Sequence, residues 1–152
     1  MNHGDVKKVM LLVEDDEADQ QLVLRAIEEG GVNFDVRIVE DGEEALDYLK
    51  HQGKFAEKGA SPRPHLILFD LSMPRMNGKK LLSQIRQNLA LSTIPAIVFS
   101  TSTRECDIRE TSFLGATAYI TKPSEPAKLV EIMQSLESFW VRTAIVPGDQ
   151  YQ

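Results

Sequence analysis

The sequence lacks most features of secreted, membrane and nucleic-acid-binding proteins. Its one cysteine, Cys106, cannot form an internal disulfide. No stretch approaches the ~20 apolar residues of a membrane span, and the start "MNHGDVKK" has no apolar signal segment. The formal net charge is −6 and the basic residues are scattered, so nothing favours binding to nucleic acid or to anionic membranes. We expect a cytoplasmic protein.

The composition is that of one ordinary globular domain. The 152 residues are 42% hydrophobic and 26% charged, which allows a sizeable core. There is no internal repeat and no low-complexity segment. We expect the domain at residues 8–142, between an N-terminal extension at 1–7 and a C-terminal tail at 143–152. That tail is too short for a DNA-binding or catalytic output module.

Strand-like and helix-like segments alternate five times along the chain. The apolar or alternating segments of strand length are 9–13, 34–41, 65–70, 95–102 and 117–123. Each precedes apolar residues at helical spacing; Ser102 and Glu105 have capping-box spacing at the fourth helix. Residues 53–64 read as an extended loop. Five βα units predict an α/β domain with a doubly wound, five-stranded parallel sheet and helices on both faces.

Polar residues follow four of the predicted strands, at the sheet edge where open α/β sheets bind ligands. They are Glu14, Asp15, Asp70, Ser100, Thr101 and Lys122. Clustered carboxylates repel one another unless a cation lies between them. Mg²⁺ prefers oxygen ligands and often binds carboxylates together with a phosphate. An Asp beside Mg²⁺ and Lys can attack phosphorus to give an acyl phosphate, so we expect phosphoryl chemistry at this edge.

Four of these segments resemble a known family. "LLVEDDE", "FDLSMPRMNG", "VFSTS" and "AYITKP" are similar to the signature segments of response-regulator receiver domains, in the family's order and each at a strand end. The resemblance covers about residues 8–140 and implies the CheY-like receiver fold, which is flavodoxin-like. The loop at 53–64 and the end "LESFWVRTAIVP" resemble small single-domain regulators associated with cyanobacterial phytochromes.

The resemblance implies a role for each matching residue. Asp70 corresponds to the phosphoacceptor, and Lys122 and Ser100 to the family's lysine and switch hydroxyl. The implied Mg²⁺ ligands are Asp15, Asp70, the backbone carbonyl of Ser72 and, through water, Glu14. Thr101 either shapes access to Asp70 or is an ordinary strand-end hydroxyl.

The resemblance also implies how the switch moves. Tyr119 corresponds to the aromatic residue that turns inward as Ser100 approaches the phosphoryl group. The Lys122–Pro123 peptide bond is expected to be cis. Two acids depart from the pattern: Glu14 stands where many members have Asp, and Asp16 is an additional acid that we expect to cap the first helix.

The histidines and the aromatic residues of the last helix have simpler structural interpretations. His3, His51 and His65 share no metal-ligand spacing. Trp140 lies on the apolar face of the last helix, as expected of a core residue. The alternative is that Phe139 and Trp140 together belong to a dimerisation surface. A homodimer could form through this helix or through the fourth and fifth strand–helix units.

The resulting hypothesis is a two-component response regulator, phosphorylated by a histidine kinase of phytochrome type and signalling through protein–protein contacts. It would be no enzyme beyond its own phosphorylation from small donors and its own dephosphorylation. One alternative is a Mg²⁺-dependent phosphatase with an Asp nucleophile. Such enzymes usually have a second Asp two residues on, where this chain has Ser72, and turnover of a phosphate ester would identify one. The other alternative is a receiver-like scaffold that is not phosphorylated.

Overall fold

The structure is a computed structural model that describes residues 7–147. Residues 1–6, with His3, and residues 148–152 lie outside the described part, so most of the expected extension and half of the expected tail are not covered. The longest helix has 13 residues. No helix in residues 7–147 is long and apolar enough to cross a bilayer.

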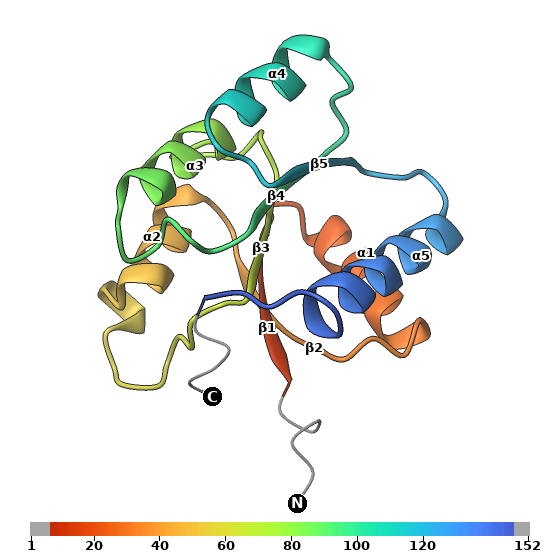
Figure 1. Cartoon of the computed structure of the whole chain (residues 1–152), viewed down its shortest axis with the longest axis horizontal. Coiled ribbons are helices and arrows are strands. Elements are labelled where there is room, and N and C mark those ends of the chain that lie inside the picture. Colours follow the sequence, from red (N-terminus) through yellow and green to blue (C-terminus); the bar gives the residue numbers. More distant parts are fainter. Residues whose placement is uncertain (1–6, 148–152) are drawn as a thin grey trace, which may run out of the picture.

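Strands and helices alternate as expected (Figure 1). The strands are β1 (Lys8–Val13), β2 (Phe34–Val39), β3 (Leu66–Phe69), β4 (Ala96–Ser100) and β5 (Ala118–Thr121). The helices are α1 (Glu17–Glu29), α2 (Gly42–Lys50), α3 (Gly78–Gln87), α4 (Glu105–Phe113) and α5 (Pro126–Leu136). A 3₁₀ turn, η2 (Gly53–Phe55), follows α2, and a π-helical segment, η3 (Glu137–Val141), continues α5.

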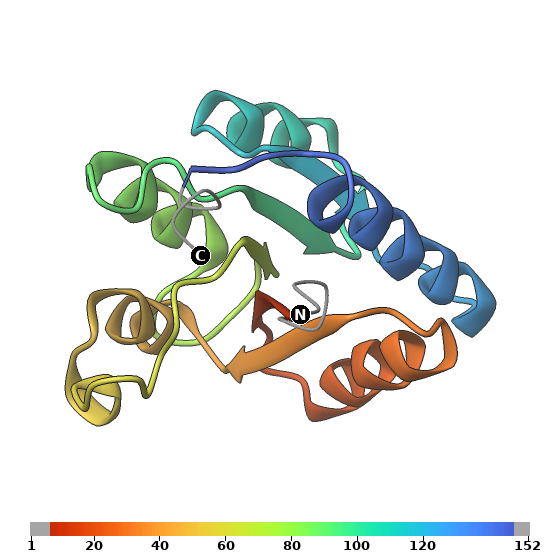
Figure 2. The same cartoon turned by 60° about the horizontal axis from the view of Figure 1, so that its bottom comes forward.

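The five strands form one parallel sheet in the order β2-β1-β3-β4-β5. Leu12 pairs with Ile38 on one side and with Leu68 on the other, which fixes the register of β1 between β2 and β3. The helices α2, α3 and α4 cover one face of the sheet, and α1 and α5 cover the other (Figures 1 and 2). The doubly wound prediction is confirmed. The strand order reverses between β1 and β3, where such sheets open a crevice at the carboxyl ends of their strands.

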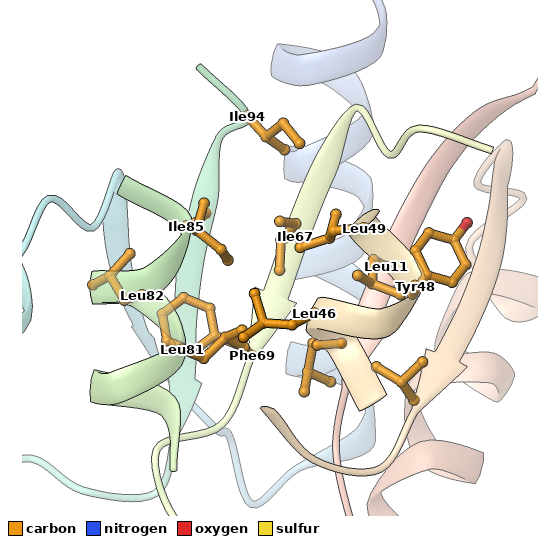
Figure 3. Packing of buried hydrophobic residues seen from close by; sticks show 14 of the residues in the cluster. Leu11, Leu46, Tyr48, Leu49, Ile67, Phe69, Leu81, Leu82, Ile85 and Ile94 are labelled. Atoms are coloured by element: carbon orange, nitrogen blue, oxygen red, sulfur yellow. The ribbon is translucent and has the colours of Figure 1, made fainter. Parts of the chain in front are cut away.

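One hydrophobic core lies between the sheet and the pair α2 and α3. Alternate strand residues such as Leu11, Ile67 and Phe69 point to this face and are fully buried. Leu46 from α2 and Leu81 from α3 meet them (Figure 3). Because every second strand residue points here, the intervening residues must be covered by the helices of the opposite face.

The second core lies between the sheet and the pair α1 and α5. Met10 and Leu12 of β1 contact a cluster that includes Val23 of α1 and Met133 of α5. Trp140, in η3, is partly buried and packs against this cluster, whereas Phe139 is 52% exposed. Both faces of the sheet are therefore apolar, which explains the continuous apolar runs of β1, β3 and β4.

Two local expectations differ from the structure. The loop after α2 is not wholly extended, since η2 docks on α2 through an edge contact of Phe55 with Tyr48 at a centroid distance of 5.1 Å. Helix α4 does not begin with a capping box: Arg104 occupies its N-cap position without a side-chain cap. The Ser102 hydroxyl lies outside the helix and donates to the Asp107 carboxylate at 2.5 Å, so it bonds to a side chain of the first turn and does not cap the helix backbone.

Candidate functional site

An open cavity of about 670 Å³ lies at the carboxyl ends of the strands. Five of the predicted site residues line it together: Asp15, Asp70, Ser72, Ser100 and Thr101. Its lining also includes residues that the sequence did not identify as site residues, namely Asn77, Lys79, Ser102, Arg104 and Asp107. The strand ends therefore meet in one hollow, as the topology requires.

Asp70 follows β3 directly and is fixed by both carboxylate oxygens. Its Oδ1 accepts the Leu71 amide at 2.7 Å, and its Oδ2 accepts a hydrogen bond from Lys122 Nζ at 3.0 Å. The first residue of α3, Gly78, lies so close that a Cβ there would be 2.2 Å from the Asp70 carbonyl oxygen. Helix α3 can begin this near to the strand end only with glycine at that position. The Asp70 side chain keeps 13% of its surface exposed toward a reactant.

Three acids, Asp70 among them, lie together at the ends of β1 and β3. Glu14, Asp15 and Asp70 bring carboxylate oxygens within 4.8 Å of one another. Glu14 is only 2% exposed, and its Oε2 accepts the Asp16 amide at 3.1 Å. Burial raises the pKa of Glu14 above its usual value, against the opposing hydrogen bond from Lys122. A hard divalent cation fits this set of oxygens, because it would offset the repulsion that burial makes costly.

Lys122 supplies the positive charge at the inner side of this cluster. Its Nζ contacts three carboxylates: Glu14 at 2.6 Å, Asp19 at 2.8 Å and Asp70 at 3.0 Å. The lysine side chain is 10% exposed. Burial lowers the pKa of Lys122, but hydrogen bonds to Asp19, Glu14 and Asp70 outweigh burial, so the pKa lies above its usual value. The lysine is therefore a fixed ammonium that positions Asp70.

Asp19 is the site residue that the sequence analysis missed. It lies in the first turn of α1, four residues after Asp15, and its Oδ2 accepts from Lys122 at 2.8 Å. The next residue, Gln20, donates from Nε2 to the Glu14 carbonyl oxygen at 2.7 Å. No local pattern marks Asp19, because Asp15 precedes α1 and the contact with Lys122, 103 residues away, is what brings Asp19 to the site.

The expected cis bond between Lys122 and Pro123 was wrong. No peptide bond in residues 7–147 is cis. An X–Pro bond favours trans by ~0.5–1 kcal/mol. The Lys122 amide donates to the Ser100 carbonyl oxygen at 2.8 Å, which extends the β4–β5 pairing by one residue. Strand pairing therefore aims the lysine at the acids.

The two expected switch residues both bond to the backbone of Ser102. Ser100 is buried, and its Oγ accepts the Ser102 amide at 3.2 Å. The Tyr119 hydroxyl donates to the Ser102 carbonyl oxygen at 2.8 Å. Thr101 lies between Ser100 and Ser102 in the sequence and is exposed at the cavity. Ser102 thus links Ser100, Tyr119 and, through its own hydroxyl, Asp107.

The remaining polar candidates have structural roles. Asp16 caps α1 as expected, since its Oδ1 accepts the amides of Ala18 at 2.8 Å and Asp19 at 3.3 Å. The His51 ring contacts the Ser61 hydroxyl at 2.8 Å, and His65 Nδ1 accepts the Val9 amide at 3.4 Å. Neither histidine belongs to the acidic cluster.

Comparison with known proteins adds to this geometry. The family model of the response regulator receiver domain matches residues 10–134. Response regulator Rcp1 of Synechocystis is 38% identical over 141 residues, which cover 93% of this chain and 94% of Rcp1. The crystal structure of the phosphorylated cyanobacterial phytochrome response regulator RcpA shares 38% identity and has a TM-score of 0.85, covering 94% of this chain and 100% of that one. The Mn²⁺-bound form of Rcp1 has a TM-score of 0.82 at 38% identity, covering 93% and 99%.

Proposed function

This chain belongs to the response regulator receiver family, and from that premise we propose that Asp70 accepts a phosphoryl group from a histidine kinase. The observation that carries the proposal is the Asp70 carboxylate at an open cavity, held on one oxygen by the Lys122 ammonium at 3.0 Å. The similarity to Rcp1 and RcpA favours a kinase of phytochrome type.

We propose further that a divalent cation, Mg²⁺ in the cell, binds beside Asp70. Asp15, Asp70 and the Ser72 carbonyl would hold it directly, and Glu14 through water. The cluster of three carboxylates supports this assignment, as does the Mn²⁺-bound structure of Rcp1. When bound, the cation supplies positive charge that offsets the acids and the incoming phosphoryl group.

The chain's own residues would carry out the transfer. A carboxylate oxygen of Asp70 attacks phosphorus; the new O–P bond forms as the phosphohistidine N–P bond breaks, and its electron pair stays on the imidazole. Lys122 orients Asp70 through its hydrogen bond to Oδ2. The Ser100 hydroxyl donates a hydrogen bond to a phosphoryl oxygen, and Thr101 shapes access from the cavity. Water later hydrolyses the acyl phosphate, so the switch resets.

Signalling would then pass through the fourth and fifth strand–helix units. Ser100 and Tyr119 both bond to Ser102, so a change at one alters the position of the other. We infer that phosphorylation biases this surface between two packings and changes its contacts with a partner or with a second copy of the chain. We propose that the protein acts in the cytoplasm through protein–protein contacts and does not turn over a substrate.

Intact-mass measurement after incubation with acetyl phosphate and Mg²⁺ tests the proposal. Wild type should gain one phosphoryl group, whereas Asp70→Asn and a sample with EDTA should gain none. Size-exclusion chromatography of the product then measures any change of oligomeric state. A folded wild type that gains no phosphoryl group from acetyl phosphate or from a phytochrome-type kinase would contradict the proposal and favour the scaffold alternative.

A further inference from the structure

Helix α4 is attached to the domain differently from its neighbour α3. The α3 residues Leu81, Leu82 and Ile85 are completely buried. In α4 the buried residues are Asp107 and Thr111, both polar, and Phe113 is 91% exposed. Helices in proteins are held mainly by an apolar face. Polar contacts must therefore account for much of the attachment of α4.

Two basic residues of α3 make contacts at the two ends of α4. Lys79 and Arg86 are seven residues apart, about two helical turns, so they lie on the same face of α3. Arg86 holds the C-terminal end: its Nε donates to the Gly115 carbonyl oxygen at 2.8 Å and its Nη1 to that of Ile94 at 2.9 Å. Gly115 has a φ of +102° and lies against the Arg86 side chain. This end of α4 is firmly fixed.

Lys79 holds the N-terminal half of α4 by a more exposed contact. Its Nζ donates to Asp107 at 2.8 Å and to Glu110 at 2.7 Å, and its side chain is 31% exposed. The other oxygen of Asp107 accepts the Ser102 hydroxyl at 2.5 Å. Hydrogen bonds from Lys79 and Ser102 lower the pKa of Asp107. The ion pair therefore connects α3, α4 and Ser102, the residue to whose backbone both switch residues bond.

Lys79 and Asp70 line the same cavity. We propose that the Lys79 ion pair is a latch that holds the N-terminal half of α4 in the unphosphorylated protein, and that phosphorylation releases it. This inference rests on the proposed function. Phosphorylation replaces the single negative charge of the Asp70 carboxylate by about two on the phosphoryl group, in the cavity that Lys79 also lines, and the phosphoryl oxygens compete with Asp107 and Glu110 for the Lys79 ammonium. Once released, α4 moves about its fixed end at Gly115.

Hydrogen–deuterium exchange of the unphosphorylated protein tests the latch. Lys79→Gln should raise exchange of the α4 amides by about fivefold, the effect of losing a partly exposed ion pair, and leave α3 unchanged. Lys79→Arg keeps the cation and should restore protection. Lys80→Gln removes the exposed neighbouring lysine and should change nothing. Unaltered α4 exchange in Lys79→Gln, or faster exchange spread over the whole domain, would overturn the latch.

A second comparison tests release by phosphorylation. Wild type treated with acetyl phosphate and Mg²⁺ should show the same rise in α4 exchange, and treated Lys79→Gln should show little further rise. Phosphorylated wild type with unchanged α4 exchange would refute release. If wild type gains no phosphoryl group, the proposed function fails, whereas the comparison of untreated variants still decides whether Lys79 holds α4.

Discussion

Replacing Lys122 by methionine removes the cation at the centre of the site and keeps most of the side-chain volume. Three carboxylates then lose a partner that lies 2.6–3.0 Å away in the native protein. Glu14 is 2% exposed and Asp70 13%, so both are left as uncompensated, mostly buried charges. Asp19 is 32% exposed, and water can replace much of its contact.

The cost follows from burial. Removing one partner of a buried ion pair costs ~3–5 kcal/mol. With the Asp19 contact discounted, we expect Lys122→Met to lower the free energy of unfolding by about 3 kcal/mol at pH 7 in EDTA. For a domain of this size that corresponds to a Tm lower by roughly 6–12 °C. Lys128→Met is the matched control, since Lys128 is 65% exposed, and should stay within about 0.5 kcal/mol of wild type.

The loss should depend on pH in a defined direction. Burial already raises the pKa of Glu14, and removing the Lys122 hydrogen bond raises it further. An acid whose pKa is higher in the folded state binds protons more readily there, so stability falls as pH rises between the unfolded and folded pKa values. The deficit of Lys122→Met should therefore shrink from pH 7 to pH 5.

Urea denaturation and scanning calorimetry, with EDTA or with Mg²⁺, measure these effects. Mg²⁺ should raise the Tm of Lys122→Met more than that of wild type, because the cation offsets charges that the lysine no longer balances. A variant as stable as wild type at pH 7 in EDTA would refute the reasoning. So would a deficit that does not change between pH 7 and pH 5.

Three further substitutions test local structure. Burial raises the pKa of Tyr48 to about 12, so its phenol should ionise late in an absorbance titration against Tyr48→Phe. Because the unfolded chain releases that proton near pH ~10, stability should fall by roughly 3 kcal/mol between pH ~10 and ~12. Asp16→Ala removes the α1 cap and should cost about 1 kcal/mol in urea denaturation, with Asp16→Asn close to wild type. Gly78→Ala places a Cβ 2.2 Å from the Asp70 carbonyl oxygen; we expect a loss of ~1–3 kcal/mol and slower phosphorylation by acetyl phosphate, and unchanged values of both would contradict that close approach.

The fold could be predicted because its signals are local. The buried runs of β1 and β3 are continuous because both faces of the sheet are covered. Glycine and proline mark the helix ends, as at Gly30–Gly31 and Pro126. Topology alone then brings Asp15, Asp70 and Ser100 to one sheet edge, because parallel strands end on the same side.

Most of the missed details depend on contacts between residues distant in sequence. Asp19 and Lys122 are 103 residues apart, and only the packed positions of α1 and β5 show that they meet. Ser102 has the local pattern of a helix cap, but its hydroxyl bonds to Asp107 and its carbonyl oxygen accepts from Tyr119. The Lys122–Pro123 bond was inferred from resemblance, and pairing with Ser100 orients the lysine in the trans form.

Mapping the phosphorylated residue tests the central claim most directly. Borohydride reduces an aspartyl phosphate to homoserine, so peptide mass spectrometry of the reduced, acetyl-phosphate-treated protein identifies the acceptor. We expect homoserine at position 70 alone, formed only with a divalent cation and absent from untreated protein. Homoserine at Asp15 or Asp16, with Asp70 unmodified, would contradict it.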